Sequence, residues 1–379
     1  MSPALRAAAA LAVAPAVSLG LARFSYALLL PAMRADLGWS YFTAGAMNAL
    51  NAAGYLAGAL LIPPALRRFD ARRVMLAGGA LAALLLAAHG LVRSDAALFT
   101  LRALSGLASA ASFVGGGVLA ARLAGRAEGQ AGLVLGIYYG GVGLGIVASA
   151  LLLPSLPWPQ GWWVLGGLAA LATLFTALGT GALAAPPARG AARVPLRLRA
   201  FGFGLASYTL FGLGYIGYMT FIVTLLREQG LSAGTVLAFY ALLGLGVIAS
   251  SWLWAGLLQR QRGGVPLTLL NALLAIATML PVLSTQPLAV YASGILFGSV
   301  FLSVVASTTA LVRHNAEPAA WPAGIAAFTI VFAGGQIVGP SLVGLIADGP
   351  GGLARGLAVS AALLALAALL GLGQRALTR

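Results

Sequence analysis

The chain has 379 residues, of which 61% are hydrophobic and only 8% are charged. A soluble protein carries about 25% charged residues, because it needs a polar surface. The composition therefore argues against a soluble globular enzyme, and also against a disordered chain, which requires low hydrophobicity. It predicts a polytopic membrane protein. The net charge of +15 does not indicate a nucleic-acid partner, because membrane insertion itself places basic residues on the cytoplasmic side.

Apolar stretches of about 20 residues mark the expected membrane-spanning helices. The first stretch looks like a signal peptide at its start, but it continues to Met33 and is too long for one. Twelve such stretches predict helices over residues 10–33, 42–64, 74–92, 96–121, 130–153, 161–183, 201–226, 233–257, 266–285, 287–312, 322–346 and 353–373.

The longest polar stretch, residues 184–199, contains two adjacent prolines and four arginines near the middle of the chain. It divides the twelve stretches into two sets of six. We therefore predict an all-α membrane protein with two pseudo-symmetric six-helix bundles, residues 1–183 and 201–379, joined by a cytoplasmic linker over residues 184–200.

The arginines provide a separate check on this count, since all 22 basic residues are Arg. With a cytoplasmic N-terminus, sixteen of them lie on the cytoplasmic side and four on the opposite side. This is the bias expected for short loops facing the cytoplasm. The remaining two, Arg23 and Arg102, lie inside predicted spans.

The two halves resemble each other when the chain is shifted by 192 positions. The shift aligns Gly20 with Gly212, Asp36 with Glu228, and Gly106 with Gly298. It therefore predicts an internal duplication. Two parallel six-helix halves form a known transporter architecture, in which the substrate site is expected near mid-membrane between the halves.

Several segments resemble motifs of the major facilitator superfamily, over essentially the whole chain. The basic loop at residues 67–73 (RRFDARR) is similar to the loop between helices 2 and 3, with Asp70 where Gly is usual. Residues 101–106 (LRALSG) resemble the helix 4 motif, and residues 136–145 (GIYYGGVGLG) the glycine-rich helix 5 motif, with Gly141 in place of Pro. Residues 20–26 (GLARFSY) and 31–34 (PAMR) are similar to the bacterial YbfB/YjiJ-like subgroup.

The resemblance implies the major facilitator fold and secondary transport by alternating access. It also implies a multi-pass protein of the bacterial inner membrane with both termini in the cytoplasm. A gating role would fall on the basic loop, at Arg68, Asp70, Arg72 and Arg73.

Arg23 is the most informative single residue. It lies about 13 residues into the first span, or roughly 20 Å at 1.5 Å per residue. A central Arg costs at least about 2.5–3.5 kcal/mol on insertion scales, so its charge must be compensated. One interpretation is that it faces the central cavity and binds an anion, for example a carboxylate. The other is that it bonds backbone carbonyls or a Tyr and only holds helices together.

Arg102 allows the same two interpretations. It either lines the cavity with Arg23, or it is tied to backbone carbonyls or to the acids Asp36 or Asp95. Because Arg23 and Arg102 align with Tyr215 and Gly294 in the repeat, we expect the positive charge on the N-terminal half only.

Aromatic and amide side chains supply the other candidate substrate contacts. Tyr208, Phe211, Tyr215 and Tyr218 share one face of the seventh helix, which fits either a cavity wall or core packing. Asn48, Asn51 and Tyr55 share a face of the second helix, as substrate contacts or as interhelical hydrogen bonds. The full predicted substrate-binding set is Arg23, Tyr26, Asn48, Asn51, Arg102, Tyr138, Tyr139, Tyr215, Tyr218, Tyr240 and Gln336.

Enzymatic chemistry finds no support in the sequence. There is no Cys or Lys, no phosphate-binding Gly-Lys-Ser/Thr loop, and no His, Asp or Glu cluster with metal spacing. We therefore expect no catalytic residues, no metal and no cofactor. The leading hypothesis is a monomeric secondary active or facilitative transporter for a small organic anion. The alternatives are efflux of amphipathic or drug-like compounds and, from another class, a membrane-embedded enzyme or receptor.

Overall fold

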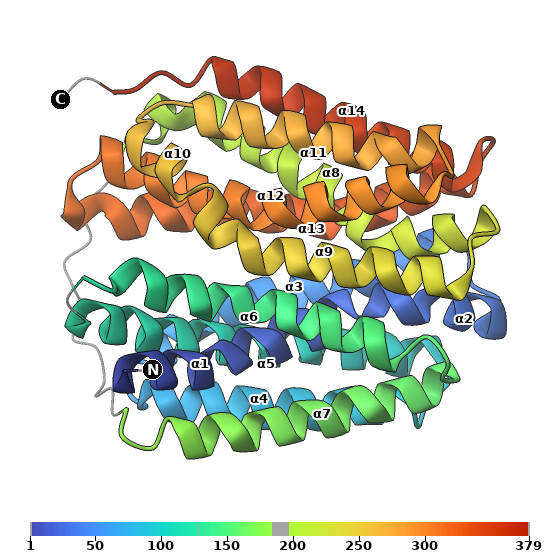
Figure 1. The fold of residues 1–379 in the computed structure, drawn as a ribbon, viewed down its shortest axis with the longest axis horizontal. Helices are drawn as coiled ribbons and strands as arrows, with labels where there is room; N and C mark the ends of the chain where they lie inside the picture. The colour runs from blue at the N-terminus through green and yellow to red at the C-terminus, as the bar shows by residue number, and fades with distance from the viewer. Residues whose placement is uncertain (1, 128, 184–196, 378–379) are drawn as a thin grey trace. The chain divides into compact units, whose positions relative to one another are not determined.

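The computed structural model describes residues 2–127, 129–183 and 197–377, and these residues form helices and no strands (Figure 1). Twelve helices in this part of the chain are long and apolar enough to cross a membrane. This confirms the predicted fold class. The twelve spans are Pro3–Leu37, Tyr41–Ala65, Ala71–His89, Asp95–Arg126, Ala131–Leu152, Trp158–Gly179, Leu198–Glu228, Ala233–Arg260, Val265–Leu283, Pro287–Asn315, Pro318–Ala347 and Gly352–Leu372.

The chain divides into two compact units. Unit 1 comprises residues 1–39 and 50–189, and unit 2 comprises residues 40–49 and 190–379. The helix α3 (Tyr41–Ala65) contributes its first turns to unit 2 and the rest to unit 1. Most of the predicted linker, residues 184–196, lies outside the described residues.

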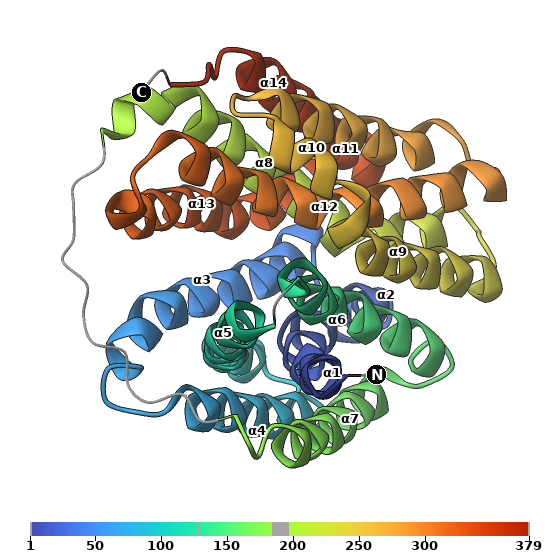
Figure 2. The same ribbon diagram turned by 60° about the vertical axis from the view of Figure 1, so that its left-hand side comes forward.

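Unit 1 is built around its first span. That span consists of α1 (Pro3–Pro15), the π-helix η1 (Ala16–Phe24) and α2 (Tyr26–Leu37). Figure 2 shows α1 lying among α5, α6 and α7, and it contacts all three. The remaining helices of the unit are α4 (Ala71–His89), α5 (Asp95–Arg126), α6 (Ala131–Leu152) and α7 (Trp158–Gly179).

Unit 2 has α8 (Gly202–Glu228) as its most buried span, packed against α11, α13 and α14. A short 3₁₀ turn, η2 (Leu198–Phe201), leads into α8, and another, η3 (Pro318–Ala320), precedes α13. The other helices of the unit are α9 (Ala233–Leu253), α10 (Ala255–Arg260), α11 (Val265–Leu283), α12 (Pro287–Asn315), α13 (Trp321–Ala347) and α14 (Gly352–Leu372).

A close contact between a glycine and a helix backbone recurs at equivalent positions in the two units. A side chain added to Gly54 of α3 would overlap the carbonyl of Ala103 in α5, and one added to Gly246 of α9 would overlap that of Ile295 in α12. Gly54 and Gly246 are 192 positions apart in the sequence, and so are Ala103 and Ile295. Small residues allow such close approach between helices in membranes. The duplicated sequence therefore builds the same helix crossing twice.

Candidate functional site

The first span changes its hydrogen-bond register at the candidate site. In η1 the turns are wider than in an α-helix, and the Ser25 N–H reaches back five residues, to the Gly20 carbonyl at 3.1 Å. Two carbonyls near this end of η1 accept hydrogen bonds from side chains: the Ser25 hydroxyl donates to the Leu21 carbonyl, and Arg102 donates to the Ala22 carbonyl. Short π-helical stretches are frequent at functional sites.

Glycines determine where η1 meets α6. A Cβ on Gly20 would lie 2.6 Å from the Gly145 Cα and 2.9 Å from the Val142 carbonyl oxygen. These neighbours are backbone atoms, so they have no side-chain torsion that could move them away. The Gly20–Gly145 crossing therefore allows η1 to lie deep in unit 1, and Arg23 lies one turn further along.

Arg23 is buried, with 4% of its surface exposed. Its guanidinium carbon lies 5.9 Å from the Phe24 ring centre and 6.0 Å from the ring of Tyr55 on α3. Aromatic rings at this distance attract a cation through their negative faces. The span thus holds a desolvated positive charge beside two rings of unit 1.

Arg102 is fully buried on α5. Its Nη1 donates to the Ala22 carbonyl at 2.8 Å, and its guanidinium carbon lies 4.9 Å from the Tyr26 ring and 5.7 Å from the Trp162 ring. The sequence allowed either a cavity role or a tie to backbone carbonyls, and the hydrogen bond to Ala22 is a tie to a backbone carbonyl. Since Ala22 directly precedes Arg23, Arg102 holds the peptide that carries the other buried arginine.

His89 extends the same cluster toward the end of α4. Its ring stacks on Trp162 with centres 4.4 Å apart, and its Nδ1 lies 2.7 Å from the Leu85 carbonyl. Trp162 also points its indole N–H toward the Met33 sulfur at 3.4 Å. Trp162 therefore packs between Arg102 and His89, a role that sequence reasoning missed.

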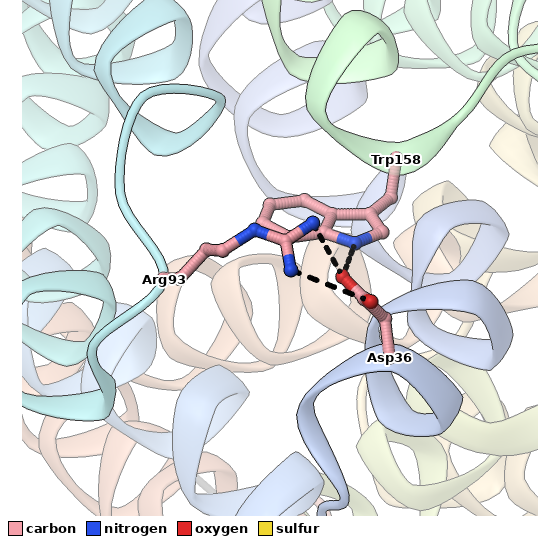
Figure 3. A network of polar contacts seen from close by, with 3 residues as sticks. All are labelled: Asp36, Arg93 and Trp158. Atoms are coloured by element: carbon pink, nitrogen blue, oxygen red, sulfur yellow. Dashed lines mark hydrogen bonds and ion pairs between the residues drawn. The ribbon is translucent and has the colours of Figure 1, made fainter.

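Asp36 joins three elements at one end of unit 1 (Figure 3). It pairs with Arg93 at 3.0 Å and accepts a hydrogen bond from the Trp158 indole at 2.8 Å. Nearby, the Trp39 indole donates to Asp95 at 2.7 Å. These acids thus bind partners at the helix ends. The Trp residues could have been noticed, since Trp is enriched at membrane–water interfaces.

The predicted face of α3 is divided between the two units. Asn51 donates to the Arg102 carbonyl at 3.2 Å, and Tyr55 flanks Arg23, both within unit 1. Asn48 lies in the part of α3 that belongs to unit 2, where it donates to the Thr220 hydroxyl at 2.7 Å. Both amides make interhelical hydrogen bonds, as one of the two interpretations expected.

The two tyrosines of α6 differ in their surroundings. Tyr138 is buried, and its hydroxyl donates to the Phe113 carbonyl at 2.6 Å. Tyr139 is 41% exposed and meets the edge of the Tyr138 ring at 5.1 Å.

The aromatic side chains of α8 pack inside unit 2. Tyr208, Phe211 and Tyr215 each stack against Phe332 of α13, and Gln336 donates to the Tyr215 hydroxyl. Three of the four predicted positions therefore form one continuous stack.

Tyr218 belongs to a separate group in unit 2. It stacks on Phe297 at 4.0 Å, and its hydroxyl lies 2.6 Å from that of Ser293. Tyr240 is buried on α9, with its ring beside Phe239.

The basic loop makes specific helix-end contacts. Asp70 caps α4 by accepting from the backbone N–H groups of Arg72 and Arg73. The Arg72 side chain donates to the Ala177 carbonyl at 2.6 Å and to the Thr180 hydroxyl at 3.2 Å, both at the end of α7. Arg68 and Arg73 have exposed side chains.

Comparison with known proteins gives a family and a fold. The family described as "Uncharacterised MFS-type transporter YbfB" matches residues 15–372. No curated protein matches the sequence significantly.

Solved structures match over nearly the full length. The nucleoside transporter NupG has a TM-score of 0.73 at 15% identity, covering 98% of this chain and 99% of its own. An inward-facing, unoccupied bacterial homologue of the human lysosomal transporter Spinster gives 0.71 at 14%, covering 98% and 96%. The human organic anion transporter MFSD10 (TETRAN) gives 0.66 at 16%, covering 98% and 100%.

Proposed function

We propose, from the premise that the chain belongs to the YbfB-type family of the major facilitator superfamily, that the small solute it carries is an organic anion. The protein is a multi-pass membrane transporter, and its family and fold are those of transporters rather than enzymes. The proposed substrate class is a small carboxylate, moved by alternating access. The mechanism fits a chain of two six-span repeats.

The observation that supports this proposal is the balance of charge in the spans of unit 1. Two buried arginines, Arg23 and Arg102, lie in their interiors. Among the described residues of unit 1, the acids lie at helix ends: Asp36 near the end of α2, Asp70 at the start of α4 and Asp95 at the start of α5. An interior with excess positive charge favours a negatively charged solute over a cationic one.

The two arginines are assigned different tasks. Arg102 clamps the Ala22 carbonyl and is enclosed by the Tyr26 and Trp162 rings, so we assign it to positioning. Arg23 follows the clamped peptide and is assigned to the carboxylate, because a guanidinium and a carboxylate form paired, charge-assisted hydrogen bonds. Tyr55 flanks Arg23 and would contact the body of the solute.

A ligand screen with purified protein tests the substrate class. Carboxylates, sulfonates, nucleosides, sugars and cationic drugs are compared for their effect on thermal unfolding, because a ligand that binds only the folded state stabilises it. At a free ligand concentration of about 100 times Kd, the ligand is expected to stabilise the folded protein by about 2.7 kcal/mol. Stabilisation by cationic amphipaths alone would instead support the efflux alternative.

Arg23→Gln tests the site. This variant is expected to lose the response to carboxylates, while the matched variant Arg126→Gln, which changes an exposed arginine at the end of α5, keeps it. If Arg23→Gln responds as the wild type does, the assignment of Arg23 is wrong. Uptake of the stabilising carboxylate into proteoliposomes, without chemical change, then tests transport itself.

The remaining expectations belong to the same proposal. We place the protein in a bacterial inner membrane as a monomer with both termini in the cytoplasm, and the arginine distribution supports this orientation of the termini. Labelling of a cysteine introduced at Ser2 from one side of the membrane tests that orientation, since the natural chain contains no Cys.

A further inference from the structure

Unit 1 has a groove on its surface between α3, α4 and α5. It has a volume of about 320 Å³ and is lined almost entirely by apolar side chains. One face of α4 forms its length, from Arg73 through Val74 and Ala77 to Leu81. Arg73 and Leu81 are eight positions apart, or about 12 Å along the helix axis.

The groove is lined by both small and large side chains. Gly78, Ala108 and Ala111 are among its small lining residues, and Ile62 and Leu107 are among the larger ones. A Cβ on Gly78 would be 2.5 Å from the Ser112 backbone nitrogen and 2.7 Å from the Ala108 carbonyl oxygen. Gly78 therefore allows close contact between α4 and α5, and the small lining residues leave room for a narrow hydrocarbon chain.

Positive charge lies at one end of this groove. Arg73 lines it, has an exposed side chain, and forms no hydrogen bond or ion pair through its guanidinium with any residue that the structure describes. Its neighbour Arg72 is by contrast bound to the end of α7. The adjoining loop adds the exposed side chains of Arg67 and Arg68, and its one acid, Asp70, caps α4.

An apolar groove on a membrane span with a guanidinium at its end matches the two parts of a phospholipid. A guanidinium binds a phosphate through paired hydrogen bonds, and basic clusters beside spans attract anionic headgroups. The exposed Phe69 and Leu81 continue the apolar surface at either end of the groove. The remaining loop arginines favour a headgroup with net negative charge over a zwitterionic one.

We propose that this groove is a binding site for an anionic phospholipid of the bilayer, with the phosphate on Arg73 and one acyl chain along α4 between α3 and α5. The site is separate from Arg23 and does not depend on which solute is carried.

Binding of added lipids to the delipidated protein in detergent, counted by native mass spectrometry, tests the proposal. The probes are phosphatidylglycerol and phosphatidylcholine with identical chains. The wild type is expected to bind phosphatidylglycerol about fivefold more tightly, the ratio expected for one additional arginine–headgroup attraction. Equal binding of the two lipids would overturn the anionic preference and with it the proposal.

Two substitutions with matched controls locate the lipid. Arg73→Gln is expected to remove the preference, while Arg126→Gln, an equal change of charge outside the groove, keeps it. Ala77→Phe fills the groove and is expected to weaken binding of both lipids. Ala80→Phe, on another exposed face of α4, leaves it unchanged.

Each contrary result overturns the assignment. If Arg73→Gln binds both lipids as the wild type does, Arg73 does not hold the phosphate. If Ala77→Phe binds them as the wild type does, the acyl chain does not lie in the groove. Displacement of the lipid by inorganic phosphate would point to a soluble anion, and loss of a protein dimer in Ala77→Phe to a second copy of the chain. If Ala77→Phe does not fold, Ala77→Leu fills the groove with a smaller side chain and is judged by the same results.

Discussion

Replacing Gly141 by Ala would force α6 away from the first span. A Cβ built on Gly141 overlaps the carbonyl of Ala12, and the Ala12 Cα follows at 3.1 Å. All of these neighbours are backbone atoms, so no side chain can rotate to make room. The helices must separate, and the Gly20–Gly145 crossing one turn further along would separate with them.

The expected cost is that of overpacking a well-packed contact, about 1–3 kcal/mol. For a unit of 150–250 residues, each kcal/mol lowers the melting temperature by about 2–4 °C. Thermal unfolding in detergent, followed by intrinsic Trp fluorescence, measures this shift. Because η1 also carries Arg23, the carboxylate response should weaken in the same variant.

Gly132→Ala is the matched control on the same helix. Nothing lies within 4 Å of a Cβ at Gly132, and Ala is a better helix former than Gly by up to about 1 kcal/mol. This variant should therefore melt at or slightly above the wild-type temperature. If Gly141→Ala and Gly132→Ala melt together, the backbone contact between α1 and α6 is not as close as described, and the reasoning fails.

Substitutions at three further places in unit 1 are compared in the same melting assay. Asp70→Ala removes the cap of α4 and should cost about 0.5–2 kcal/mol, whereas Asp70→Asn should keep most of the stability; equal losses would argue against capping. Gly38→Ala places a side chain at a backbone angle φ of +66° and should cost about 1–2 kcal/mol, and an unchanged melting temperature would contradict that conformation. Asp36→Asn and Arg93→Gln, combined in a double-mutant cycle, should show a coupling of less than about 1 kcal/mol, since the two side chains are 37% and 67% exposed; a larger value would mean that the pair is shielded from water.

The positions of the spans could be predicted from hydropathy, but some of their ends could not. The first helix begins at Pro3, directly after the capping Ser2, whereas the apolar pattern predicted residue 10. Ser2 and Pro3 form a typical helix start, but hydropathy alone does not mark it, because a helix can begin before the apolar stretch. The fourth span continues to Arg126 rather than 121, because a helix can extend past its apolar part when its last turn carries Arg.

The glycine pattern of α6 shows what periodicity misses. The four-residue spacing of Gly132, Gly136 and Gly140 is typical of a close helix contact in membranes, but Gly132 meets open space, and Gly141 and Gly145 make the contacts with α1 and η1. Both sets repeat every four residues. Which set faces a neighbour depends on how the helices pack, and one sequence does not contain that information.

The candidate site was predictable as a list of unusual residues rather than as an arrangement. Arg23 and Arg102 stand out because charge inside a span is costly. Their different surroundings depend on the change to π-helical register and on Trp162, which comes from a helix far along the chain. Hydrogen-bond register follows from tertiary contacts, so hydropathy and spacing do not report it.

The wide turns of η1 have a consequence for chain length. A π-helical stretch holds one residue more than the α-helical turns that it replaces, so it acts as a single-residue insertion in the first span. Deleting one residue between Ala16 and Phe24 would therefore allow regular α-helix without turning one end of the span relative to the other, whereas deleting one residue within α1 would rotate the residues before it by about 100°. The wide turns of η1 thus absorb the extra residue locally, and the Ala12 carbonyl next to Gly141 keeps its orientation in unit 1.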